Sequence, residues 1–230
     1  MLLAEISLAG QEHLDPAYVA AYDRKAGFDP TEELVLLREL GLGEQSTLVD
    51  LGAGTGTLAL AAAAHCRKVV AVDVSAEMVA ATKKKAIGLG VANVECVHAG
   101  FLSYQRRGVP VDFVYSRNAL HHLPEFWKAV ALERVSLMLR PGGILRLRDI
   151  VFAFEPSEAE RFIGHWLDSA TESRKDGWTR AGLAAHLRDE HSTFSWLLEP
   201  MLERAGFEIK QASYESRRVF AEYVCVKIGS

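Results

Sequence analysis

A glycine-rich turn is the part of the sequence that most clearly indicates chemistry. It reads Val49-Asp50-Leu51-Gly52-Ala53-Gly54-Thr55-Gly56-Thr57, directly before an apolar stretch at 58–64. Glycines between a strand and a helix let the backbone turn sharply and approach a ligand, with the first helical amides facing it. Asp73 closes the next apolar run, where a carboxylate can accept hydrogen bonds from ribose hydroxyls. Together these residues predict a site for an adenosine cofactor.

Two residues of this turn decide which cofactor is expected. A dinucleotide fingerprint would place its third glycine at position 57, where this chain has Thr57. Asp50 would repel a pyrophosphate, whereas it would attract the ammonium and sulfonium groups of S-adenosylmethionine. The turn therefore favours S-adenosylmethionine, with S-adenosylhomocysteine as product, over a nicotinamide cofactor.

With these residues the sequence resembles the class I S-adenosylmethionine-dependent methyltransferases, most of all the small-molecule type of ubiquinone and menaquinone biosynthesis. The resemblance covers roughly residues 30 to 150 and includes four motifs in order. These are Asp50-x-Gly52-x-Gly54-x-Gly56, Asp73 with Val74-Ser75-Ala76-Glu77-Met78, the segment 111–123, and Leu139-Arg140-Pro141-Gly142-Gly143-Ile144-Leu145.

The resemblance implies a set of cofactor-binding residues. They are Asp50, Gly52, Ala53, Gly54, Asp73, Val74, Met78, Gly100, Phe101, Ser116 and Asn118. Asp50 would hold the amino group of the methionine portion, and Asp73 the ribose hydroxyls. Family members usually carry an acid after the third strand for the adenine amino group, whereas this chain has Gly100 there, followed by Phe101. A backbone group, or packing on Phe101, would have to replace that acid.

Three residues are candidates for catalysis. Methyl transfer is an in-line displacement that needs alignment first, and oxygen or nitrogen acceptors also need a base. By the resemblance, the segment after the fourth strand lies at the methyl end of the cofactor, so His122 is the first candidate and His121 the second. Asp149, at the end of the fifth strand, could also face the site. Local hydrogen bonding or capping is the alternative for each. No metal site is expected.

The substrate candidates lie in two regions outside the motifs. Tyr18 and Tyr22 precede the first covering helix, in a segment that either folds over the cofactor as a lid or forms a short surface helix. The others are aromatic or histidine residues of the C-terminal third, where ordinary helix packing is the alternative. They are His165, Trp166 and Trp196.

The elements that must position these residues alternate along the middle of the chain. Short apolar runs at 47–50, 68–73, 94–97, 111–115 and 143–149 are separated by helical patterns, which is typical of a parallel sheet covered on both faces. Residues 207–210 and 220–228 predict an antiparallel hairpin. The fold class is therefore α/β: a doubly wound, mostly parallel seven-stranded Rossmann-like sheet with a C-terminal hairpin and a helical cap insertion.

The predicted organisation is a single domain, 1–230, with four parts. Residues 1–28 form the lid segment, 29–150 the cofactor-binding core, 151–205 the helical substrate cap without a strand, and 206–230 the hairpin. Amphipathic spacing supports helices in the cap, with a kink or a new helix start at Pro200.

Composition limits the functions that fit. The 230 residues carry a formal net charge of −4 and three cysteines, which favours a cytoplasmic protein with reduced thiols and disfavours a nucleic-acid partner. No apolar run is long enough for a membrane span, and the first residues do not read as a signal peptide. We expect a monomer or homodimer that methylates a small molecule. The alternatives are an RNA or protein methyltransferase, or a cofactor-binding protein without transfer activity.

Overall fold

The chain folds around one mixed sheet with helices on both faces. The computed structural model describes residues 3–172 and 177–229, without the side chains of 11 and 12. The strand order is β3-β2-β1-β4-β5-β8-β7, with β6 pairing to β5 off this path. The strands are β1 (Thr47–Leu51), β2 (Lys68–Asp73), β3 (Val94–His98), β4 (Val111–Arg117), β5 (Leu139–Phe152), β6 (Thr193–Phe194), β7 (Phe207–Tyr214) and β8 (Phe220–Lys227). The predicted fold class is confirmed.

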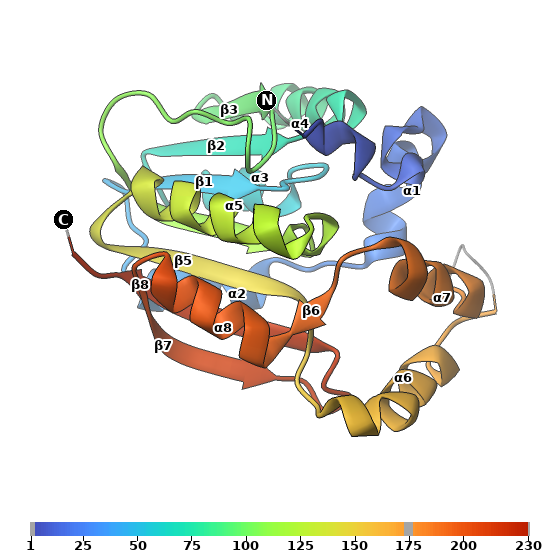
Figure 1. The fold of residues 1–230 in the computed structure, drawn as a ribbon. Helices are drawn as coiled ribbons and strands as arrows, with labels where there is room; N and C mark the ends of the chain where they lie inside the picture. Colours follow the sequence, from blue (N-terminus) through green and yellow to red (C-terminus); the bar gives the residue numbers. More distant parts are fainter. Residues whose placement is uncertain (1–2, 173–176, 230) are drawn as a thin grey trace.

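Two helical layers cover the sheet (Figure 1). The bounds of the α-helices are α1 (Pro16–Ala26), α2 (Thr31–Glu39), α3 (Thr57–Ala62), α4 (Ala76–Gly88), α5 (Glu125–Met138), α6 (Ala159–Asp168), α7 (Arg180–Asp189) and α8 (Ser195–Arg204). Neighbouring residues of β1 point into different cores: Leu48 packs with α2 and α3, and Val49 with α5 and α8. Burial on both faces explains why β1 is apolar except for Thr47 at its start and Asp50.

The C-terminal strands join the sheet as an antiparallel pair. β8 pairs with β5 from Ile144↔Val226 to Ile150↔Phe220, and β7 pairs with β8 at the edge. Two details of the sequence prediction for this region were wrong. Thr193 and Phe194 form the two-residue strand β6 beside Val151 and Phe152, and α8 runs through Pro200 as one helix.

β5 begins earlier than the apolar pattern indicated. The apolar run was expected to begin at 143, but β5 starts at Leu139 directly after α5 and includes the Pro-Gly-Gly sequence at 141–143. A Cβ at Gly143 would lie 2.8 Å from the carbonyl oxygen of Arg140, so the local backbone requires glycine there. The pairing of β4 and β5 shifts register between Val111 and Phe113, where this irregular start is absorbed.

The insertion between β5 and β7 carries helices and its own small core. Its helices are the short 3₁₀ helix η4 (Pro156–Glu158), α6 and α7, before β6 and α8. Phe152, Phe154, Trp166, Leu183 and Val219 form its buried cluster, so α6 and α7 pack against the end of β5 and the β7–β8 turn. In Figure 1, α6 and α7 stand beside the sheet. Residues 173–176 of the predicted cap lie outside the described residues.

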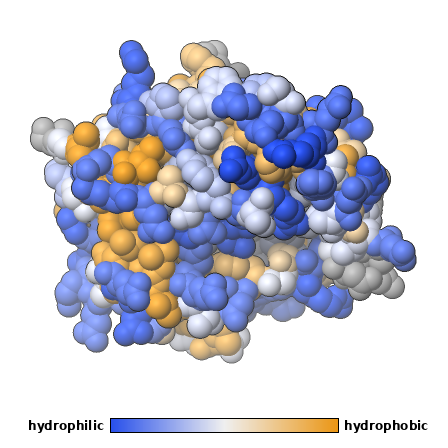
Figure 2. All heavy atoms as spheres, turned by 90° about the horizontal axis from the view of Figure 1, so that it is seen from below, coloured by the Kyte–Doolittle hydropathy of each residue, from blue (hydrophilic) through white to orange (hydrophobic). Residues whose placement is uncertain are grey.

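The outside of the molecule is mainly polar on the face shown in Figure 2, where apolar side chains gather in a band at the left. None of the helices among residues 3–172 and 177–229 has the length and apolar character needed to cross a membrane.

A buried ion pair ties α2 to the centre of the sheet. The Arg146 guanidinium on β5 donates to both carboxylate oxygens of Glu33, at 2.9 and 2.7 Å, and to Glu222 of β8 at 2.6 Å. Arg146 and Glu33 are 3% and 8% exposed. Removing one partner of such a pair leaves an uncompensated charge in the interior.

We therefore expect Glu33→Ala to lower the free energy of unfolding by about 3 kcal/mol, at the lower end of the cost of breaking a buried pair. Urea denaturation followed by circular dichroism measures this. Glu32→Ala, at the exposed neighbouring position on the same helix, is the control and should change stability by less than about 0.5 kcal/mol. Equal effects of the two substitutions would contradict the assigned role of the ion pair.

Candidate active site

The principal cavity lies at the carboxyl ends of the parallel strands. Strand order reverses between β1, which continues to β2 and β3, and β4, which continues to β5. Ligands of doubly wound sheets bind outside such a switch point. The cavity encloses about 730 Å³, including the part open to solvent, and is lined by the turns after β1, β2, β3 and β4.

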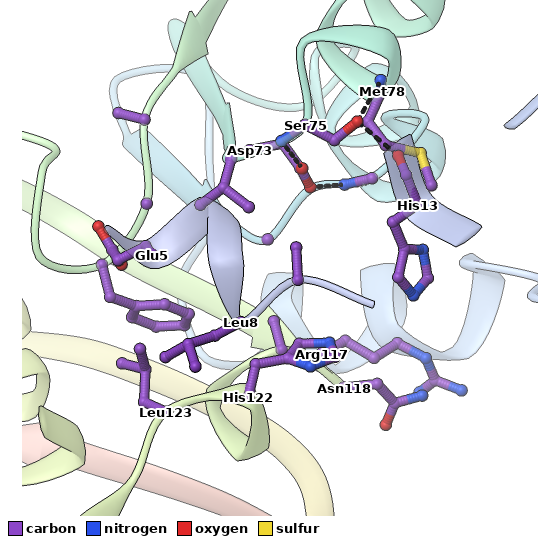
Figure 3. A pocket seen from close by; sticks show the side chains of 18 of the residues that line it. Glu5, Leu8, His13, Asp73, Ser75, Met78, Arg117, Asn118, His122 and Leu123 are labelled. Atoms are coloured by element: carbon purple, nitrogen blue, oxygen red, sulfur yellow. Dashed lines mark hydrogen bonds between the residues drawn. The ribbon is translucent and has the colours of Figure 1, made fainter. Parts of the chain in front are cut away.

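The Asp73 carboxylate is held at the centre of this cavity. One oxygen accepts a hydrogen bond from the Gly54 N–H at 2.7 Å, and the other from the Ser75 N–H at 2.8 Å. Figure 3 shows both bonds, with Glu5 toward one end of the cavity and Asn118 toward the other. Burial raises the pKa of Asp73 and the two amides oppose that shift. Each oxygen keeps a lone-pair site, so Asp73 can accept a pair of hydroxyl groups.

The glycines of the turn after β1 are required by their surroundings. Gly52 has a φ of +75°, and a Cβ there would lie 2.3 Å from the Cβ of Ala119 in the segment after β4. The turns after β1 and β4 therefore meet at the backbone of Gly52 and open the cavity beside them. Gly52, Gly54, Ala119 and Asn118 all line it, and Asn118 also has a positive φ of 51°.

Asp50 lies behind the glycine turn at 2% exposure and does not line the cavity directly. Burial, and then the charge of Asp73, raise the pKa of Asp50 to about 7, while the Ala59 amide opposes the shift. Asp50 therefore changes its charge near neutrality. A cation close to the turn would favour its ionised form.

The predicted cofactor residues divide into two groups. Besides the glycines, Asp73 and Asn118, the cavity is lined by Val74, Met78, Gly100 and Phe101. Ala53 is half-buried in the turn, and Ser116 is buried under it; like Asp50, neither lines the cavity.

The N-terminal segment covers one side of the cavity, and sequence reasoning identified only part of it. Tyr22 of α1 lines the cavity, whereas Tyr18 packs beside it with ring centroids 6.0 Å apart. Asp23 of the same helix accepts hydrogen bonds from Thr55 and pairs with Lys85 of α4. Before α1, Glu5 and His13 also line the cavity, and Ser75 donates to the His13 carbonyl at 2.6 Å.

Glu5 belongs to the 3₁₀ helix η1 (Glu5–Ser7) and reaches the loop after β3. Its carboxylate accepts hydrogen bonds from the Leu102 N–H at 2.9 Å and from the N–H and hydroxyl of Ser103 at 2.9 and 2.8 Å. No short-range sequence pattern predicts this contact, because Leu102 and Ser103 are 97 and 98 residues away from Glu5 in the chain.

A buried network of histidines and acids adjoins the other end of the cavity. His121, in the 3₁₀ helix η3 (Leu120–His122), contacts Asp149 through Nδ1 and lies 2.9 Å from Glu190 through Nε2. Nδ1 of His186 lies 2.7 Å from the same Glu190 oxygen. Although burial opposes a charge on His121, Asp149 and Glu190 outweigh it and raise the pKa of His121 to about 9. His121 is therefore an imidazolium between two carboxylates.

His122 differs from His121 in both position and charge. It lines the cavity, whereas His121 and Asp149 are buried behind it. Burial, and then the positive charge of His121, lower the pKa of His122 to about 3. His122 is therefore a neutral imidazole at the cavity wall. Its ring centroid lies 4.3 Å from that of His121 and 6.0 Å from that of His13.

Glu190 and His186 were missed as parts of this network, since they come from the cap insertion. The ligand-capable atoms of His121, His186 and Glu190 lie within 4.8 Å of one another, which is a geometry that could admit a metal ion. The carboxylates on both sides of His121 account for its position without one. The His191 N–H donates to the His121 carbonyl at 3.0 Å and fixes the cap to the segment after β4.

The remaining predicted substrate residues do not line the cavity. Trp166 is buried in the cap and packs edge-on against His186 at 5.6 Å between centroids. His165 is exposed on α6, and Trp196 is half exposed on α8, stacked on Phe194. Their proposed contact with a substrate stays a prediction.

Comparisons with known proteins agree with this geometry. A family model described as "Methyltransferase domain" matches residues 48–143. An uncharacterized methyltransferase of Geobacillus kaustophilus is 26% identical over 212 residues, covering 83% of this chain and 97% of that protein. The solved structure of a SAM-dependent methyltransferase from Aquifex aeolicus is similar with a TM-score of 0.62 at 22% identity, covering 92% and 98% of the two chains. Magnesium protoporphyrin IX methyltransferase from Synechocystis, solved with bound SAM, gives 0.66 at 14% identity and covers 98% of both.

The charge on His121 makes stability depend on pH. Its pKa is about 9 in the folded protein against an ordinary value of 6.5 for histidine, so its contribution is complete below pH 6.5 and is lost as pH rises through 9. We expect Asp149→Asn to lower the free energy of unfolding by about 3 kcal/mol near pH 6 and by much less near pH 9.5. Urea unfolding at a series of pH values measures the difference. Asp168→Asn, in an exposed ion pair on α6, should show a small and constant effect. A pH-independent loss in Asp149→Asn would argue against a charged His121.

Proposed function

We propose that this methyltransferase is of the class I S-adenosylmethionine-dependent type and that it methylates a small-molecule acceptor at the end of the cavity bounded by His122. One observation carries this proposal. The cavity along the carboxyl ends of β1–β3 continues to His122, which is a neutral imidazole, and helix α1 lies over this cavity. A cavity that is partly covered in this way suits a compact acceptor.

The residues present fit the cofactor. The Asp73 carboxylate has lone pairs available for two ribose hydroxyls, and the turn at Gly52 and Gly54 lets a ligand approach the backbone. Asp50 supplies negative charge behind this turn for the ammonium group. Val74 and Met78 offer apolar contacts for the purine ring. When bound, S-adenosylmethionine supplies the activated methyl group.

The protein's part in the reaction is alignment and removal of a proton. Holding an acceptor in line with the methyl carbon and sulfur can contribute about 7 to 11 kcal/mol in favourable cases. His122 is neutral and can accept the proton that an O–H acceptor loses. A weak base suffices for a hydroxyl acceptor when the proton leaves after the new O–C bond has formed, because the methylated oxygen is then strongly acidic. Asp149 and Glu190 hold His121 as a cation, and so keep His122 unprotonated until transfer.

Several features favour a small acceptor over a macromolecule. The chain has a net charge of −4, which disfavours an RNA partner. The N-terminal segment and the cap insertion meet beside the cavity: Lys25 of α1 lies 3.9 Å from the ring centroid of Trp178 in the cap. The free thiols Cys66, Cys96 and Cys225 suit a reducing, cytoplasmic compartment. A protein that binds the cofactor without transfer is the alternative.

A panel assay tests the proposal. Purified protein is incubated with S-adenosylmethionine and with phenols, amines, thiols and quinone precursors, and release of S-adenosylhomocysteine is measured. Product from at least one class, with a methylated acceptor confirmed by mass spectrometry, would support it. Cofactor binding without turnover on any small molecule, together with turnover on RNA or protein, would overturn it.

The ionisation of Asp50 predicts pH-dependent cofactor affinity. Because its pKa is about 7 and the ammonium group requires the carboxylate, the affinity for S-adenosylhomocysteine should fall by up to about tenfold from pH 8 to pH 6. Calorimetric titration measures this. Asp50→Asn should bind more weakly with a flat profile, while Glu44→Gln, at an exposed position, should retain the slope. An unchanged slope in Asp50→Asn would assign the titration to another group.

The role of His122 is tested on the best acceptor from the panel. For a hydroxyl acceptor, His122→Ala should lower kcat by about 10²- to 10⁴-fold, the usual contribution of a general base. The affinity for S-adenosylhomocysteine should stay within about twofold. His165→Ala, at an exposed position on α6, should leave kcat unchanged. Full turnover in His122→Ala would exclude it as the base.

A further inference from the structure

Gly100 leaves a gap in the cofactor site that the N-terminal segment fills. It stands where the resemblance places an acid, and Gly100 itself offers no carboxylate. A Cβ built on Gly100 would lie 2.5 Å from Oε1 and 2.7 Å from Cδ of Glu5. In an aspartate, each carboxylate oxygen lies about 2.4 Å from its own Cβ. Oε1 of Glu5 therefore lies about as far from this Cβ as an aspartate oxygen would, although Cδ lies farther away than the roughly 1.5 Å of a bonded carboxyl carbon. The Glu5 carboxylate thus borders the space that an acidic side chain at position 100 would enter.

The hydrogen bonds of Glu5 within the described residues leave one lone pair of its carboxylate without a donor. Oε2 accepts from both the N–H and the hydroxyl of Ser103, which fills its two lone-pair sites. Oε1 accepts only from the Leu102 N–H in the described part of the chain, so one lone pair remains. Glu5 is 7% exposed and lines the cavity. A buried carboxylate with a free lone pair there calls for an N–H or O–H donor from a ligand.

The surroundings of Glu5 suit a purine. Leu8, Val74 and Phe101 line the cavity with it and provide apolar contacts. Asp73 ends β2, next to β3 in the sheet, so the loop after β3 flanks Asp73 on one side. The apolar residues beside Glu5 favour that side for the base of a nucleoside whose ribose is bound by Asp73. Figure 3 shows Glu5 and Leu8 together on that side of Asp73.

We propose that Glu5 binds the exocyclic amino group of the adenine, through Oε1, in place of the acid missing at position 100. The N-terminal segment is thus part of the cofactor site as well as a cover for it. This inference rests on S-adenosylmethionine as cofactor and does not depend on the acceptor.

The test compares S-adenosylhomocysteine with its 6-deamino analogue, in which purine replaces adenine and only the amino group is lost. Both are titrated calorimetrically into the wild-type chain, Glu5→Ala, Glu5→Gln and the control Glu39→Gln, at an exposed position at the end of α2. The wild-type chain and Glu39→Gln should bind the adenine compound about 10- to 100-fold more tightly than the analogue, as expected for a bond to a charged acceptor. In Glu5→Ala the ratio should fall to within about threefold of one.

The ratio of the affinities for the two compounds distinguishes a loss of adenine recognition from a loss of folding. Loss of the bonds to Leu102 and Ser103 weakens binding of both compounds and lowers the unfolding temperature, but it does not change their ratio. An unchanged ratio in Glu5→Ala would overturn the proposal and leave Glu5 as a support of the loop after β3. If Glu5→Ala binds neither compound, Glu5→Gln decides: its amide oxygen is an uncharged acceptor, so the ratio should fall below that of the wild-type chain, and an unchanged ratio would overturn the proposal. Absence of binding to the wild-type chain would instead contradict the cofactor assignment itself.

Discussion

The geometry of the site depends on the two backbone hydrogen bonds that the Asp73 carboxylate accepts. This carboxylate lies at the end of β2 and accepts one hydrogen bond from the turn after β1 and one from its own turn. The positions of Gly54 and Ser75 are thereby fixed relative to each other. A Cβ built on Gly54 would lie 3.7 Å from Cε1 of Tyr22, so this glycine lies close to the Tyr22 ring. The Ser75 hydroxyl donates a hydrogen bond to the His13 carbonyl. The N-terminal cover is thus attached to the same two turns that Asp73 connects.

Charge is distributed along the cavity in a consistent way. Glu5, Asp73 and Asp50 place acids along the ends of β3, β2 and β1, which suits a cofactor with an amino group, hydroxyls and an ammonium along its length. Beyond β4 the pattern changes to a cation, His121, enclosed by Asp149 and Glu190. The enclosed cation leaves His122 neutral at the cavity wall, which suits the site of a methyl acceptor better than another charge would.

Sequence reasoning succeeded where the signal was local. The glycine turn, Asp73 and the alternation of strands and helices depend on residues close in the chain, and these features were found. Strand β6 was not predicted, because a strand of two residues is too short to show the alternation of apolar and polar side chains. α8 runs through Pro200 despite the missing amide, since the rest of its apolar face packs against the sheet through Leu198 and Leu202.

The missed site residues share one cause. Glu5 meets the loop after β3 across 97 residues, and Glu190 meets His121 across the cap insertion. Neither contact has a spacing rule, because it depends on how separate elements pack. Gly100 did signal that an acid was missing, but only the fold could show which residue replaced it.

Placing the adenine contact on the N-terminal segment changes what cofactor binding does. An acid at position 100 would belong to the loop after β3, and its bond to adenine would not involve the N-terminal segment. Glu5 is held by the loop after β3 and belongs to the segment that also contributes His13 and leads into α1. Any free energy gained between Glu5 and the base therefore also stabilises the docked segment over the cavity, by mass action. Because α1 of this segment carries Tyr22 and contacts the cap at Trp178, binding of the cofactor would favour the closed site before an acceptor is aligned.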